Sequence, residues 1–90
     1  MAAADDAHLL ERLLKGEQRA YKELVTTYQS AMRAVAYAIV GQRHADEVVQ
    51  DAWLSVVRSL ARFEGRSSLK TWLLTITANS AKGRYKQNRR

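Results

Sequence analysis

Apolar side chains recur along most of this chain at steps of three and four residues, the spacing that places them on one face of an α-helix. A first segment, from about Asp5 to Lys15, carries Leu9, Leu10, Leu13 and Leu14. A second, from about Glu17 to Val40, repeats Tyr21, Leu24, Val25, Tyr28, Met32, Val35, Ala36 and Ile39. Gly16 and Gly41 follow these segments, and glycine commonly ends helices. The pattern predicts a short helix followed by a long one.

Two more amphipathic segments follow. The third helix is expected to begin near Ala45 or Asp46 and to close near Arg62, with an apolar stripe of Val49, Ala52, Trp53, Val56 and Leu60, widened by Val48 and Val57. Residues 63–68 have the composition of a loop, and Ser67 or Ser68 can cap the next helix. That helix runs from about Leu69 to Gln87, with Trp72, Leu73, Ile76 and Ala78 facing inward. We therefore expect an all-α fold, a compact bundle of three long helices plus a short N-terminal helix.

The composition supports this fold class and excludes others. Ninety residues suffice for one domain. The chain has no proline and four glycines, which argues against sandwiches and barrels because these need frequent turn residues. It has no cysteine, so disulfides and thiolate metal sites are excluded and a cytoplasmic location fits. Its apolar runs are too short for membrane insertion.

The charge is strongly polarised along the chain. Residues 1–60 carry a net charge of −1, whereas residues 61–90 carry +7. A basic segment of this kind attracts a phosphate backbone or an anionic membrane surface. A solvated basic tail would have the same composition, so charge alone leaves the choice open.

Candidate catalytic chemistry is sparse. His8 and His44 each stand in a hydrophilic setting, and no nucleophile motif or glycine-rich phosphate loop is present. Asp46, Glu47 and Asp51 are better explained by the helix dipole and a solvated or partner-binding face than by a metal site. We expect no enzyme activity, no cofactor and no metal.

Candidate binding chemistry is concentrated in the last third of the chain, where aromatic residues alternate with cations. Single-stranded nucleic acid is bound by such mixtures, because cations follow the phosphates and flat rings receive unstacked bases. Asn79 offers a donor and an acceptor to a base edge. Core packing of Trp72 and simple surface exposure of Asn79 remain open alternatives.

The order of the residues carries more information than their types. Three motifs stand at defined spacings: Asp46-Glu47-Val48-Val49-Gln50-Asp51, then Phe63-Glu64-Gly65-Arg66-Ser67, then Trp72-Leu73 with Ile76 and Asn79. Together they resemble conserved region 2 of bacterial RNA polymerase sigma factors, most closely the extracytoplasmic-function class (sigma-70 family, group IV). The resemblance covers residues 6–90. Full members carry a second domain, region 4, which we do not find in residues 1–90, so we expect an isolated or truncated region 2 domain.

The resemblance implies two partners, each with its own set of residues. One is promoter DNA, whose minus-ten element is melted and held as a single, non-template strand with flipped bases. The positions implied for this DNA binding are Phe63, Arg66, Ser67, Lys70, Thr71, Trp72, Thr75, Asn79, Lys82, Arg84, Lys86, Arg89 and Arg90. The other is RNA polymerase core, through the clamp helices of its β′ subunit, and the implied contacts are Asp46, Glu47, Val49, Gln50, Asp51, Leu54 and Arg58. The resemblance further implies an anti-sigma factor as a partner.

Two departures from the family pattern limit what the resemblance implies, one at Gly83 and one in the loop, where Glu64 and Arg66 occupy positions that vary between members. Gly83 stands where well-known members often place a second polar residue after the asparagine. Two other functions stay open. A helix-turn-helix regulator of duplex DNA would require base-reading side chains at the start of its recognition helix, where this chain has Leu69, Trp72 and Leu73. A protein-interaction bundle with an incidental basic tail is the other alternative.

Overall fold

The computed structural model describes residues 4–88, and within them the fold is built from helices. These are α1 (Ala4–Leu14), α2 (Gln18–Val40), α3 (Gln42–Ser59), a short 3-10 helix η1 (Leu60–Arg62) and α4 (Leu69–Asn88). The predicted all-α bundle of three long helices and one short N-terminal helix is confirmed.

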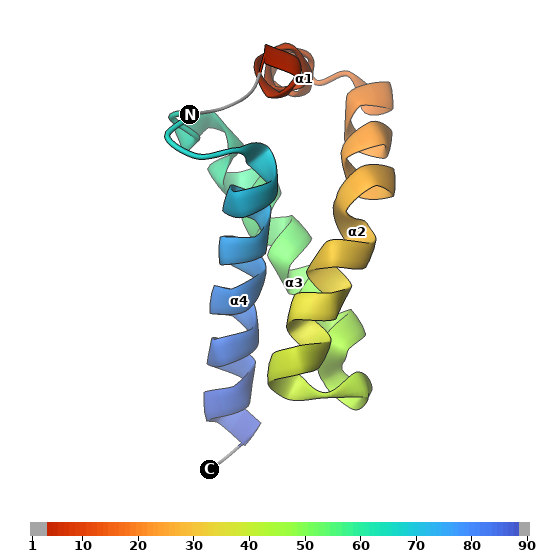
Figure 1. Cartoon of the computed structure of the whole chain (residues 1–90), viewed down its shortest axis with the longest axis vertical. Coiled ribbons are helices and arrows are strands. Elements are labelled where there is room, and N and C mark those ends of the chain that lie inside the picture. Colours follow the sequence, from red (N-terminus) through yellow and green to blue (C-terminus); the bar gives the residue numbers. More distant parts are fainter. Residues whose placement is uncertain (1–3, 89–90) are drawn as a thin grey trace.

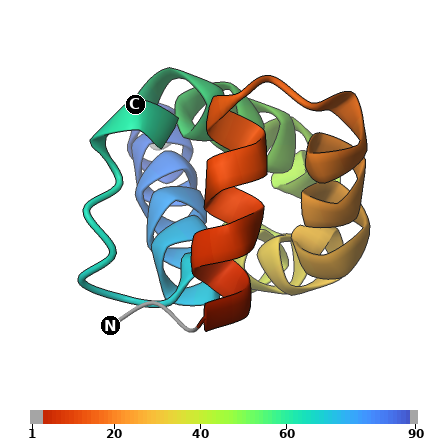
Figure 2. The same cartoon turned by 90° about the horizontal axis from the view of Figure 1, so that it is seen from above.

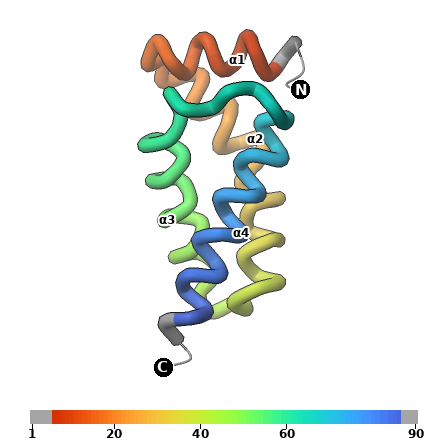
Figure 3. The backbone as a smooth tube through the Cα atoms, turned by 90° about the vertical axis from the view of Figure 1, so that its left-hand side faces the viewer, coloured from red at the N-terminus to blue at the C-terminus, as the bar shows by residue number. Residues whose placement is uncertain are grey.

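The three long helices pack lengthways, and α1 lies across one end of them (Figure 1). The chain runs down α2, back along α3 and down again along α4, so α2 and α4 are parallel and α3 is antiparallel to both. Seen from above, α1 crosses the end of the bundle (Figure 2). The segment before α4 passes just below α1 (Figure 3). This arrangement brings residues from opposite ends of the sequence together.

The core lies between the three long helices and is made mainly of small and medium apolar side chains. Every helix contributes to it: Leu13 from α1, Ala20, Leu24, Met32 and Ala36 from α2, Ala45, Val48, Val49, Ala52 and Val56 from α3, and Leu69, Leu73 and Ala81 from α4. Small residues allow helices to approach closely. The alanines that the composition makes abundant therefore serve the packing of α2, α3 and α4.

The connection between α2 and α3 is shorter than the sequence suggests. Gly41 alone joins them; its φ of 82° is accessible to glycine, and its N–H donates to the carbonyl of Tyr37 at 2.9 Å. The prediction that the third helix begins near Ala45 is wrong, because α3 already begins at Gln42. Asp46 and Glu47 therefore lie beyond the first turn, and the helix dipole is not the main reason for their position.

Three side chains face differently from the orientation that periodicity predicts. Leu14 and Val57 belong to the predicted apolar faces, but each is 54% exposed. On α4, Thr77 takes a fully buried position that the sequence pattern leaves to apolar residues. Its hydroxyl donates to the carbonyl of Leu73 at 2.8 Å, so the polar group is satisfied within its own helix and can be buried at little cost.

Candidate nucleic-acid interface

The segment between η1 and α4 forms a small open hollow. Its volume is about 280 Å³, and its lining consists of Arg62, Phe63, Glu64, Arg66, Ser67 and Trp72. The rings of Phe63 and Trp72 lie 4.9 Å apart between centroids and are inclined by 46°. Both side chains are half-buried, so part of each ring packs inward and part faces the hollow. The hollow thus combines aromatic surface with two guanidinium groups.

The first turn of α4 is held by two side chains. The Ser68 hydroxyl accepts a hydrogen bond from the Thr71 N–H at 3.1 Å, which confirms one of the two serines expected as the cap. The Leu69 N–H donates to Oδ2 of Asp6 at 3.0 Å. Sequence analysis does not find this contact, because no local pattern reports a partner 63 residues away.

The outward face of α4 is polar and cationic. Thr71, Thr75, Asn79, Lys82 and Lys86 follow one another at steps of three or four residues, and all are exposed. Lys70 is exposed beside them, and α4 contains no acidic residue. The side chain of Thr75 donates to the Thr71 carbonyl at 2.8 Å, which leaves its oxygen able to accept. This stripe begins at Thr71, the residue before Trp72 of the hollow, and continues along the helix.

Asn79 lies where α4 meets α3. It is exposed and lines a hollow of about 240 Å³ together with Asp51, Ser80, Gly83 and Arg84. Apart from its chain neighbours and the backbone of its own helix, Gly83 has no atom within 4 Å of where a Cβ would stand, so the missing side chain leaves open space in the hollow that Asn79 lines. Asn79 is therefore accessible, as contact with a base requires, and Arg84 lines the same hollow.

The exposed face of α3 lies on the other side of this hollow. Glu47, Gln50, Asp51, Leu54 and Arg58 are all exposed and recur at helical steps. Leu54 is 55% exposed, and its neighbours one turn away are the polar Gln50, Asp51 and Arg58 and the exposed Val57. The structure thus brings most of the residues expected to contact the polymerase onto one face.

Comparison with known proteins decides the family. Residues 24–90 match the family model for sigma-70 region 2. The chain belongs to this family. Over 77 residues, or 86% of its length, it is 38% identical to the ECF RNA polymerase sigma-E factor of Escherichia coli K12 and 34% identical to that of Haemophilus influenzae. It spans about 40% of the length of these relatives. The expected membership in the extracytoplasmic-function class is confirmed.

A solved structure gives the same fold for a relative of this region 2 domain. It is the NMR structure of an engineered region 2 of sigmaE in complex with GTAAAA. The two chains superpose with a TM-score of 0.82 at 33% identity, covering 91% of this chain and 86% of the other. The helical arrangement described above is therefore that of a sigma region 2 domain.

Two residues of the region 2 domain differ from their expected placement. Val49, expected at the polymerase contact, is only 6% exposed and packs in the core, so it offers almost no surface to a partner. Arg84, expected to hold phosphate, is half-buried and forms an ion pair with Glu47 of α3. Its charge is already partnered within the domain.

Two further predicted residues have charged partners that the sequence does not indicate. Arg66 pairs with Glu64 at 2.9 Å, and Asp46 pairs with Arg33 of α2 at 2.5 Å. Arg89 and Arg90 lie outside the described residues. Across the part of the chain that the structure describes, no group of three potential metal ligands is found, and no helix is apolar and long enough to cross a membrane.

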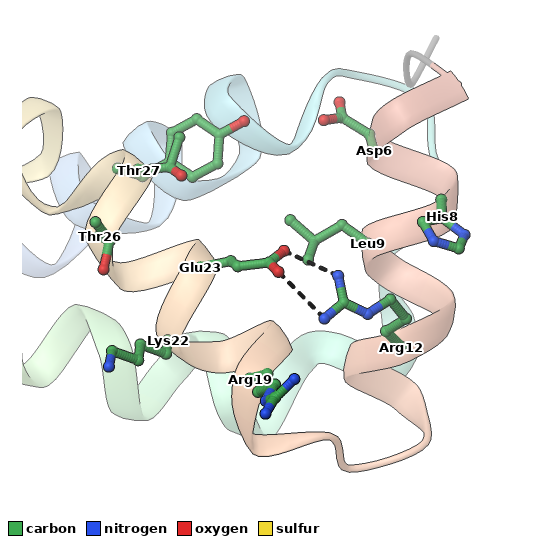
Figure 4. Close-up of a pocket in the computed structure, with 10 residues that line it drawn as sticks. Asp6, His8, Leu9, Arg12, Arg19, Lys22, Glu23, Thr26 and Thr27 are labelled. Atoms are coloured by element: carbon green, nitrogen blue, oxygen red, sulfur yellow. Dashed lines mark hydrogen bonds and ion pairs between the residues drawn. The ribbon is translucent and has the colours of Figure 1, made fainter.

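Another, more voluminous hollow lies between α1 and α2, and no residue of α4 lines it. Its volume is about 730 Å³. Arg12 crosses it to both carboxylate oxygens of Glu23, at 2.9 and 3.2 Å (Figure 4). The hydrogen bond from Arg12 lowers the pKa of Glu23 below its ordinary value. This ion pair ties α1 to α2.

Proposed function

We propose that this domain is the promoter-recognition module of a sigma factor, acting in the cytoplasm without any catalytic step. In this proposal it holds the non-template strand of the minus-ten element as a single strand, with a base flipped into the hollow between η1 and α4. The observation that carries the proposal is that this aromatic hollow adjoins the first turns of α4, the helix whose exposed face is polar and cationic. The related region 2 bound to GTAAAA supports it.

The physical argument concerns the cost of separating the strands. Unstacking a base costs a few kcal/mol. Stacking a base on an aromatic ring returns about 1–3 kcal/mol, and Phe63 and Trp72 present such rings at the hollow. Lys70, Lys82 and Lys86 neutralise phosphates along the strand, and such contacts position the strand without reading its sequence. Asn79 is the side chain that we assign to a base edge.

The second part of the proposal is that α3 docks on the clamp helices of the polymerase β′ subunit. Leu54 supplies an exposed apolar contact, and Glu47, Gln50, Asp51 and Arg58 surround it with polar groups. An apolar anchor within a polar surface suits a helical partner. Val49 is buried, so it packs in the core behind this face and does not contact the partner.

The test compares single-stranded and duplex DNA. Fluorescence anisotropy is measured at low salt with the hexamer GTAAAA, its complement, and a hairpin duplex containing the same six base pairs. The proposal predicts that GTAAAA binds at least tenfold more tightly than the duplex. Equal or tighter binding of the duplex contradicts it and favours a duplex regulator, and absence of any binding contradicts it in favour of a protein-interaction bundle.

A matched pair of lysine variants tests which face binds the phosphates. Lys82→Ala is expected to reduce the slope of log affinity against log salt by about 0.7, the value for one phosphate contact on a single strand. Lys22→Ala removes the same charge from α2, at the hollow beside α1, and is expected to leave the slope unchanged. An equal change of slope in the two variants would mean that the DNA is attracted by the total charge of the domain and not by the face of α4.

A further inference from the structure

Asp6 occupies an unusual position for a carboxylate. It is 9% exposed, and acidic side chains are rarely buried without a partner. Its partner is the Leu69 N–H, at 3.0 Å. Leu69 is the first residue of α4 and is fully buried. A residue near the start of the chain thus holds the start of its last helix.

The surroundings of Asp6 join three helices. The residue stands on α1, it binds α4, and it lines the hollow between α1 and α2 together with Tyr28. Burial and, to a smaller extent, the negative charge of Asp6 raise the pKa of Tyr28. In Figure 4 Asp6, Leu9 and Arg12 project from α1 towards α2. The carboxylate therefore sits where α1, α2 and α4 meet.

The far end of α1 is attached independently of Asp6. Arg12 binds Glu23 of α2 at 2.9 and 3.2 Å and Glu17 at 3.4 Å. These contacts hold α1 against the start of α2 and do not involve α4. A variant that weakens these contacts loosens α1 from α2 but leaves the hydrogen bond from Leu69 to Asp6 in place, so it serves as a control.

Leu69 lies directly between the two parts of the proposed DNA site. Before it come Ser67, which lines the hollow, and Ser68, whose hydroxyl caps the same turn. After it come Lys70, Thr71 and Trp72, and Trp72 forms a wall of the hollow. If the Leu69 N–H lost its partner, a buried donor would be left unsatisfied. The turn would relieve this by opening, and the hollow would change with it.

We propose that Asp6 is a positioning residue for the promoter-binding site: it fixes the first turn of α4 and the adjoining hollow without contacting DNA itself. The inferred effect of Asp6 on DNA affinity rests on the proposed function, because it assumes that the hollow captures a base. The structural part of the inference, the geometry of the turn, is measurable without DNA.

The experiment compares Asp6→Ala, Asp6→Asn and the control Glu23→Gln in the full chain. Hydrogen exchange of the Leu69 amide and the NMR signal of the Trp72 indole report the turn, and anisotropy reports the affinity for GTAAAA and its salt slope. Asp6→Ala is expected to exchange Leu69 at least tenfold faster, to shift the Trp72 signal and to bind GTAAAA five- to tenfold more weakly. The part of the salt slope that comes from Lys82 and Lys86 is expected to stay constant, because they lie further along α4, so any decrease is limited to about 0.7, the contribution of Lys70.

The two other variants separate positioning from general loosening. Asp6→Asn retains an acceptor oxygen but loses the charge that strengthens the bond, so it is expected to fall between wild type and Asp6→Ala in all three readouts. Glu23→Gln loosens α1 from α2 and is expected to leave the Leu69 amide and the affinity unchanged. Where Asp6→Ala does not fold, Asp6→Asn carries the comparison.

Several results overturn the proposal. One is unchanged Leu69 exchange in the Asp6 variants, and another is faster exchange spread evenly over α2, α3 and α4, which indicates global destabilisation. Equal effects of Glu23→Gln and Asp6→Asn contradict it as well. If wild type binds no single strand, the proposed function fails, whereas the Leu69 and Trp72 signals still confirm or refute the positioning of the turn.

Discussion

At the scale of single residues, the role that we propose for Asn79, contact with a base edge, depends on the residues around it. Asn79 is exposed on α4, the helix that also carries Lys82 and Lys86. Gly83 lines the same hollow and leaves open space there because it has no side chain. An amide can both donate to and accept from a base edge. In the proposed function, the surrounding residues supply charge and shape, and Asn79 supplies the hydrogen-bonding pattern.

We predict that Asn79→Ala weakens binding of GTAAAA by about 1–3 kcal/mol, the usual range for a good base contact. The loss should depend on the base sequence, so the affinity for a permuted hexamer of the same composition should change little. Gln18→Ala removes an exposed amide from the start of α2 and serves as the control. An equal loss for both hexamers would show that Asn79 does not read a base.

Residue placement also shows what a sequence can predict. The inward positions of Leu24, Met32, Val56 and Leu73 follow from helical periodicity alone, because each is one of several apolar residues at the same steps. Thr77 and Asp6 could not be predicted. Each is a buried polar group, and its burial depends on a hydrogen bond that only the folded chain makes visible.

At the scale of elements, α3 packs on one face and is exposed on the other. Val48, Ala52 and Val56 are fully buried, whereas Leu54, in the same helix, is 55% exposed. The helix α3 begins at Gln42, directly after Gly41, and Gly41 allows the chain to reverse direction between α2 and α3. A helix that is fixed along one side in this way presents its other side as a rigid surface.

This rigid surface leads to a prediction for the polymerase contact. Leu54→Glu is expected to weaken association with a β′ clamp-helix fragment at least tenfold, because a charge would replace the apolar anchor. Leu14→Glu places the same change at an equally exposed leucine on α1 and is expected to have no effect. Circular dichroism should show equal helicity for both. Binding that survives Leu54→Glu would place the docking surface elsewhere.

The attachment of α1 leads to a prediction about pH. Arg12 lowers the pKa of Glu23 in the folded chain, so the ion pair stabilises the fold above the ordinary glutamate pKa and is lost as the pH falls through the lowered value. Thermal melts from pH 7 to pH 3 should therefore show Glu23→Gln less stable at neutral pH, with a difference from wild type that shrinks as the pH falls. A constant difference across this range would contradict the assignment.

At the scale of the whole molecule, folding places basic and acidic residues on neighbouring helices. Four of the eight cations in residues 61–90 lie on α4, and the acidic residues Glu47 and Asp51 lie on the neighbouring α3. The ion pair of Glu47 with Arg84 joins the two faces. Charge counting predicts the basic segment, but it cannot predict that one of its arginines is partnered within the fold.

Family resemblance and local physics explain different features of the molecule. Periodicity predicts the helices and most of the core, and the order of the motifs in residues 46–79 is sufficient by itself to indicate sigma region 2. The contacts that hold the site together, from Asp6 to Leu69 and from Glu47 to Arg84, join segments far apart in the chain. Such contacts lie outside the reach of local patterns.

The central claim is that DNA binds along the outward face of α4 and in the hollow before it. The most direct test is an NMR titration of the isotope-labelled chain with GTAAAA. The account predicts that chemical shifts change at residues 63–72 and at Thr75, Asn79 and Lys82, while the hollow between α1 and α2 stays unaffected. Shift changes confined to α1 and α2, or none at low salt, would contradict it.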